Sequence, residues 1–128
     1  MATILIAENE PDISQALTVL LRRAGHRPLH TSDGNDALDQ AGAASVDLLI
    51  MNPALPGMNG LDVCRRLRDE AGTARLPILM LSVHQYPAEQ QAARAAGADD
   101  YLGKPFHPHE LLARVETLLD ASERPGRS

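Results

Sequence analysis

The stretch Val46-Asp-Leu-Leu-Ile-Met-Asn52 decides the fold class of this 128-residue chain. Apart from Asp47, every residue from 46 to 51 is apolar. A short, nearly continuous apolar run is typical of a strand that is buried on both faces of a parallel sheet. Similar runs, TILIA at 3–7 and PILML at 77–81, lie on either side of it in the sequence. Segments with helical periodicity separate these runs, so the sequence predicts alternating strands and helices.

Periodicity and turn residues predict five strand–helix units. We expect strands at 3–7, 27–31, 46–51, 77–81 and 99–102, and helices at 11–24, 33–42, 59–71, 87–96 and 108–120. Pro28 cannot donate a ladder hydrogen bond, so the second strand belongs at a sheet edge. The flavodoxin-like order 2-1-3-4-5 places that strand at an edge. The predicted fold is therefore α/β: a single doubly wound five-stranded parallel sheet in this order, with helices on both faces.

Composition limits the classes of function. The net charge is −5 and no basic run is present, which argues against direct nucleic-acid binding by this domain. A single cysteine, Cys64, excludes an intrachain disulfide and is expected to be a small buried apolar residue. No apolar run approaches the roughly 18 residues of a membrane span, and the start lacks a basic signal segment. We expect a soluble cytoplasmic protein, with one domain at 1–120 and a flexible tail or linker start at 121–128.

Polar residues follow the strong strands, at the edge where sites form in open α/β sheets. They are Glu8, Asn9, Asn52, Ser82 and Lys104. Loops at strand ends are polar in any protein, so an ordinary polar loop remains an equal alternative on geometry alone. Lys104, however, is the only lysine among 12 basic residues. Its ammonium is a compact point charge, unlike a guanidinium, which favours a specific role at this strand end.

Four segments resemble the receiver domains of two-component response regulators. They are ILIAENEPDI at 4–13, VDLLIMNPALPGMNG at 46–60, LMLS at 79–82 and AGADDYLGKPF at 96–106. Each segment alone is a modest signal, but four in order at the right spacing are specific, and the resemblance covers residues 3–119. It implies a signalling protein of phosphorelay signal transduction rather than an enzyme.

The resemblance also implies the roles of individual residues. Glu8 and Asn9 occupy the two acidic positions that help to hold Mg²⁺, and Asn52 occupies the phospho-acceptor position. The resemblance implies that Ala54 offers a backbone carbonyl to the metal and that the hydroxyl of Ser82 bonds the phosphoryl group. Tyr101 takes the position of the switch aromatic. Lys104 takes that of the phosphate-pairing lysine, and its peptide bond to Pro105 is expected to be cis.

Two of the acidic positions carry amides, which changes the expected chemistry. The acceptor must be an ionised carboxylate, because its oxygen anion attacks phosphorus, so Asn52 is not phosphorylatable. Mg²⁺ prefers carboxylate oxygens. We therefore expect no cofactor, or Mg²⁺ bound at most weakly by Glu8, Asn9, Asn52 and Ala54.

An ion pair is expected to replace the metal in the resting pocket. Glu8 and Lys104 can balance each other, with Asn9 and Asn52 hydrogen-bonded around them. Glu10, at the start of the following helix, is expected to turn outward.

The sequence thus predicts an atypical receiver, or pseudo-receiver, that acts as a phosphorylation-independent interaction module. The resemblance implies protein partners, or a second copy in a homodimer, at the face of the fourth helix, fifth strand and fifth helix. The alternative is an ordinary receiver with an engineered Asp→Asn change at 52, although Asn9 and Pro53 are further departures that favour natural divergence. A flavodoxin-like enzyme or cofactor binder is disfavoured, because no Gly-rich phosphate loop follows Ala7 and aromatic residues make up 2% of the chain.

Overall fold

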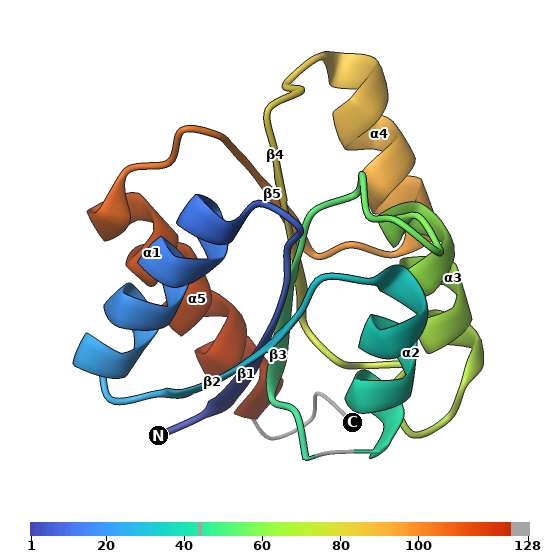
Figure 1. Ribbon diagram of the computed structural model, residues 1–128. Coiled ribbons are helices and arrows are strands. Elements are labelled where there is room, and N and C mark those ends of the chain that lie inside the picture. Colours follow the sequence, from blue (N-terminus) through green and yellow to red (C-terminus); the bar gives the residue numbers. More distant parts are fainter. Residues whose placement is uncertain (44, 124–128) are drawn as a thin grey trace.

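The computed structural model describes residues 1–43 and 45–123, in which five strands alternate with five helices (Figure 1). The strands are β1 (Thr3–Ala7), β2 (Arg27–Thr31), β3 (Leu48–Met51), β4 (Ile78–Ser82) and β5 (Asp100–Gly103). The helices are α1 (Pro11–Arg23), α2 (Gly34–Ala43), α3 (Gly60–Asp69), α4 (Pro87–Ala96) and α5 (Pro108–Glu123). None of the helices within these described ranges is long and apolar enough to cross a membrane.

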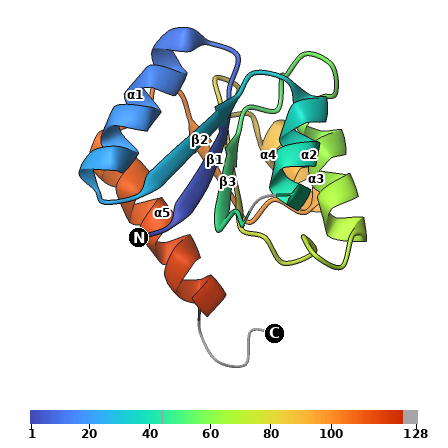
Figure 2. The ribbon, with the colours of Figure 1, turned by 60° about the horizontal axis from the view of Figure 1, so that its bottom comes forward.

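The five strands form one parallel sheet in the order β2-β1-β3-β4-β5, as predicted. Pro28 lies in the edge strand β2, opposite Ile4 of β1, where its missing N–H costs the sheet least. Helices α1 and α5 cover one face of the sheet, and α2, α3 and α4 cover the other (Figures 1 and 2). The doubly wound arrangement follows from the right-handed crossover that each strand–helix–strand unit makes.

Each strand supplies side chains to two cores, one on each face. In β1, Ile4 and Ile6 pack with α1 and α5, whereas Leu5 and Ala7 pack on the side of α2, α3 and α4. All four side chains are fully buried. Because successive side chains of a strand point to opposite faces, a strand covered on both faces must be apolar throughout. This is the physical reason that the apolar runs in the sequence predict the strands.

Most predicted bounds agree with the structure to within one residue, and side-chain contacts explain two that differ by two residues. The strand β3 begins at Leu48 rather than Val46: the carboxylate of Asp47 accepts the backbone N–H of Thr3 at 2.7 Å and takes the place of a ladder bond. The helix α3 ends at Asp69 rather than Ala71. There the hydroxyl of Thr73 donates to the carbonyl of Leu67 at 2.7 Å and draws the chain into a turn.

The last helix is longer than predicted. It continues to Glu123, three residues beyond the predicted end at Asp120, so it enters the segment expected to be a tail. Residues 124–128, the rest of the predicted tail, lie outside the described residues.

Candidate functional site

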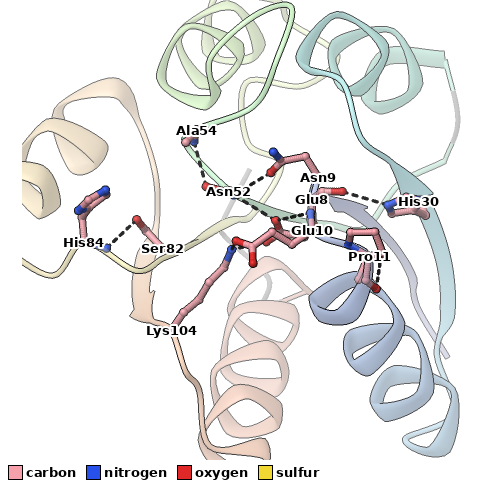
Figure 3. A network of polar contacts seen from close by, with 11 residues as sticks. Glu8, Asn9, Glu10, Pro11, His30, Asn52, Ala54, Ser82, His84 and Lys104 are labelled. Atoms are coloured by element: carbon pink, nitrogen blue, oxygen red, sulfur yellow. Dashed lines mark hydrogen bonds and ion pairs between the residues drawn. The ribbon is translucent and has the colours of Figure 1, made fainter.

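Three polar side chains from distant parts of the sequence meet at the carboxyl edge of the sheet (Figure 3). Glu8 follows β1, Asn52 follows β3 and Lys104 follows β5. These three residues are only 2%, 7% and 6% exposed, respectively. Backbone hydrogen bonds continue just past each strand, including Asn52 N–H to the carbonyl of Ala7 at 2.9 Å and Lys104 N–H to that of Ser82 at 2.8 Å. The sheet thus fixes the backbone that carries this buried polar cluster.

The centre of the cluster is the ion pair that the sequence predicts. The ammonium Nζ of Lys104 lies 2.6 Å from Oε1 of Glu8. That carboxylate oxygen has no hydrogen bond of regular geometry in the described structure, so the ammonium alone compensates its charge. A buried charge without a partner is costly, and each member of the pair therefore requires the other.

The prediction for Glu10 is only half right. Its side chain is 56% exposed, yet its Oε1 lies 3.4 Å from Nζ of Lys104. The backbone N–H of Glu10 donates to Oε2 of Glu8 at 3.1 Å, which folds the chain back over the pocket just before Pro11 starts α1. Lys104 therefore faces two carboxylates, one buried and one at the surface.

The carboxamide of Asn52 is bonded at both ends. Its Nδ2 donates to Oε2 of Glu8 and to Oδ1 of Asn9, each at 3.1 Å, and its Oδ1 accepts the backbone N–H of Ala54 at 2.9 Å. Both hydrogens of the amide are used, which only an amide, not a carboxylate, provides. An aspartate in this conformation would place an oxygen beside Glu8 Oε2, and two like charges at that distance disfavour ionisation of one of them.

The donor set does not suit Mg²⁺. Glu8 is the one buried carboxylate of the pocket and is already paired with an ammonium, and the oxygens of Asn9 and Asn52 accept hydrogen bonds. No group of three or more histidine, cysteine, aspartate or glutamate side chains in the described residues is placed to hold a metal ion. Ala54, predicted to offer a carbonyl, contacts Asn52 through its N–H.

The two predicted switch residues are joined through the backbone of His84. Oγ of Ser82 accepts the backbone N–H of His84 at 3.1 Å, and the hydroxyl of Tyr101 donates to the carbonyl of His84. Ser82 and Tyr101 are both buried. The loop after β4 is therefore fastened from both sides, and because the contacts are to backbone atoms of His84, no side-chain pattern could have shown them. The peptide bond between Lys104 and Pro105 is cis, as the resemblance implies.

The loop after β3 is held against the start of α2, which positions Asn52 and Ala54. The N–H of Gly34 donates to the carbonyl of Pro56 at 2.9 Å, and a Cβ on Gly34 would lie 1.7 Å from the carbonyl oxygen of Met58. Gly57 adopts a φ of +81°, which favours glycine. Asn59 caps α3 by accepting the N–H of Asp62 at 3.0 Å.

Comparison with known proteins identifies the family. The model of the response regulator receiver domain matches residues 4–116. The chain belongs to the response regulator receiver family. The DNA-binding response regulator MtrA of Mycolicibacterium smegmatis is 39% identical over 120 residues, which are 94% of this chain and 51% of MtrA. The alkaline phosphatase synthesis transcriptional regulatory protein PhoP of Bacillus subtilis is 37% identical over 120 residues, 94% of this chain and 49% of PhoP. The chain thus spans about half the length of these curated relatives.

Solved structures confirm the receiver fold. The chemotaxis response regulator CheY4 of Vibrio cholerae has a TM-score of 0.87 and 31% identity, covering 92% of this chain and 98% of that one. The receiver domain of the sensor histidine kinase PA1611 of Pseudomonas aeruginosa has a TM-score of 0.87 and 28% identity, covering 93% of this chain and 98% of that one. That neighbour holds a magnesium ion in its active-site cleft. The relatives of this receiver are response regulators, which are signalling proteins of two-component systems.

Proposed function

We propose that this receiver transmits signals through protein contacts in the cytoplasm, without phosphorylation of its acceptor position. The observation that carries the proposal is the carboxamide of Asn52, which is bonded at both ends in the acceptor position. Phosphoryl transfer to a receiver needs an oxygen anion that attacks phosphorus. A carboxamide has no such anion, and its nitrogen lone pair is delocalised into the carbonyl group.

The ammonium of Lys104 takes the part of the pocket cation in this proposal. It lies 2.6 Å from Glu8 and both residues are buried, so a metal ion would gain little by entering. Isothermal titration calorimetry with Mg²⁺ is expected to give a dissociation constant above about 1 mM. Binding much tighter than this would show that the pocket opens and accepts the ion, and would contradict the assignment of Lys104.

The surface formed by α4, β5 and α5 is the proposed output face, for a partner protein or for a second copy. A row of charged side chains joins these three elements. Arg114 of α5 contacts Asp100 of β5 at 2.7 Å and Glu110 at 3.5 Å, and Arg94 of α4 contacts Asp100 at 3.8 Å. Exposed ion pairs contribute little to stability but give a surface specificity toward partners. The net charge of −5 disfavours a nucleic-acid partner for this domain.

A second function is that of an ordinary receiver whose acceptor has been changed from Asp to Asn. Glu8 contacts both Asn52 and Lys104, so an acidic residue and a lysine remain beside position 52, which supports this alternative. The contact between Asn52 Nδ2 and Asn9 Oδ1 favours the main proposal, because the two amides are matched as donor and acceptor. The two functions differ in what a single restored aspartate would achieve.

Incubation with acetyl phosphate and Mg²⁺, followed by intact-mass measurement, separates the two functions. The variants are Asn52→Asp, Asn9→Asp/Asn52→Asp and, as a control for the same chemical change outside the pocket, Asn59→Asp. The main proposal expects no phosphate on the unchanged chain or on Asn59→Asp, and efficient uptake only by the double variant. Rapid uptake by Asn52→Asp alone would favour the ordinary receiver.

A further inference from the structure

A small apolar hollow lies beside the Asn52 pocket, between α4 and the residues that follow β3. Its volume is about 190 Å³. We call this cavity the α4 hollow. The residues that line it include Pro53, Ala54, Leu61, Ala92, Ala93 and Tyr101. Ala54, Ser82 and His84, which also line it, are drawn in Figure 3.

Small side chains leave this space open. Ala54, Ala92 and Ala93 are three of the residues that line the hollow, and none of them has side-chain atoms beyond Cβ. The ring of Tyr101 is buried and held by its hydroxyl contact to the carbonyl of His84, so it forms a fixed wall. The atoms that line an empty apolar cavity lack van der Waals contacts on one side, and an apolar side chain of another protein could supply them.

The size of the hollow indicates a protein side chain rather than a free organic ligand. Small-molecule sites usually measure about 300–1,000 Å³, so 190 Å³ is too small for one and suits a single large apolar side chain. Val83 and Tyr86, in the same loop as His84, are 59% and 67% exposed. Exposed apolar side chains next to a pocket are typical of protein interfaces, where one anchor fills the pocket and its neighbours exclude water.

The charge of the hollow specifies the partner further. Glu89, in the first turn of α4, is exposed and is one of the lining residues. It makes no ion pair with any side chain in the part of the chain that the structure describes. A basic residue of the partner, near its apolar anchor, would complement this carboxylate.

We infer that the α4 hollow binds one apolar side chain of a partner protein, with an arginine or lysine of that partner placed at Glu89. The inference rests on the proposed function, in which contact rather than phosphorylation carries the signal, and it adds a second docking surface to the α4–β5–α5 face. The hollow is physically joined to the pocket, because the N–H of Ala54 donates to Oδ1 of Asn52 at 2.9 Å. The arrangement of Asn52 therefore sets one wall of the docking site.

Selection from a displayed library of random 12-residue peptides tests the inference. Peptides are selected on the unchanged chain, after removal of those that bind Ala92→Leu, in which the new side chain fills the hollow. Dissociation constants of the selected peptides are then measured by fluorescence anisotropy on the unchanged chain, Ala54→Leu, Glu89→Gln and Ala95→Leu. Ala95 is an exposed alanine of α4 outside the hollow and is the matched control. Thermal unfolding of each variant verifies that it is folded.

The expected peptides carry a large apolar residue near an arginine or lysine. Ala54→Leu, which adds a larger side chain to the lining from outside α4, should weaken them about 10-fold or more, and Glu89→Gln about 2- to 5-fold, while Ala95→Leu leaves binding unchanged. Failure to enrich any peptide, or equal binding to all variants, would overturn the inference. So would a concentration-dependent dimer that Ala92→Leu abolishes, because a second copy would then be the occupant. These results are independent of phosphate uptake, which alone decides the proposed function.

Discussion

At position 52, one nitrogen in place of one oxygen changes both the chemistry and the charge balance of the pocket. The sequence predicted the ion pair of Glu8 with Lys104 and the amides around it, because charge balance requires a partner for each buried group. It did not predict that Glu10 approaches Lys104. That contact depends on how the backbone bends before Pro11, which residue types alone do not determine.

Removal of the buried carboxylate of Glu8 should lower the free energy of unfolding more than removal of the exposed carboxylate of Glu10. Glu8→Gln leaves the ammonium of Lys104 without its buried partner, and we expect the free energy of unfolding to fall by about 3 kcal/mol. Glu8→Gln/Lys104→Met should recover most of this loss. Urea denaturation measures both, with Glu10→Gln as the control, which should cost less than about 1 kcal/mol. A stability of Glu8→Gln equal to that of the unchanged chain would contradict the role of the pair.

The buried thiol gives a stability that depends on pH. Burial raises the pKa of Cys64 above its ordinary value of 9.0, so the folded protein keeps a proton that the unfolded chain releases. Its contribution is complete below that ordinary pKa and is lost as the pH rises above it. Denaturation of the unchanged chain and of Cys64→Ala at pH 7 to 10 should show their stability difference shrinking only above pH 9. A difference that is constant, or that grows with pH, would show that the thiol is not desolvated.

Among the helices and strands, the bounds were predicted most accurately for helices whose ends are marked by a proline or glycine. The bounds of α4 are those predicted, because Pro87 starts the helix and Gly97, with a φ of +113°, ends it. The bounds of β3 and α3 were less accurate, since Asp47 and Thr73 act through contacts to distant or turn backbone. The role of Arg68 as a connector was not predicted, because its partners are backbone carbonyls outside its own helix.

Arg68 connects the end of α3 to the turn between α4 and β5. Its guanidinium donates to the carbonyls of Thr73, Ala74, Leu76 and Gly97, and pairs with Asp99 at 3.0 Å. Arg68→Ala leaves these carbonyls without that donor, so we expect a loss of about 2–4 kcal/mol in unfolding free energy. Arg68→Lys should not restore it, because an ammonium lacks the planar fork of donors.

Arg65 on the same helix is the matched control for this prediction. Its pair with Asp62 is exposed, so Arg65→Ala should change stability by less than about 0.5 kcal/mol. Chemical denaturation of the three variants under one set of conditions gives the comparison. Equal losses at positions 65 and 68 would show that the connections of Arg68 do not stabilise the fold.

For the whole molecule, the parallel sheet brings the pocket residues together from loops that are far apart in sequence. Strand order could be predicted because Pro28 identifies an edge strand and apolar runs identify central ones. The α4 hollow could not be predicted, because its lining residues come from segments that are distant in sequence and meet only in the fold. A pocket that is internally paired, next to an open apolar hollow, supports a receiver that acts by docking rather than by chemistry.

The most direct measurement is a phosphate map of the unchanged chain after exposure to a small phosphodonor with Mg²⁺, read by mass spectrometry of the peptides that contain Glu8, Asn52 and Lys104. None of these peptides is expected to gain the mass of a phosphate, however long the incubation. A phosphate located on the peptide of Asn52, in stoichiometric amount, would contradict it.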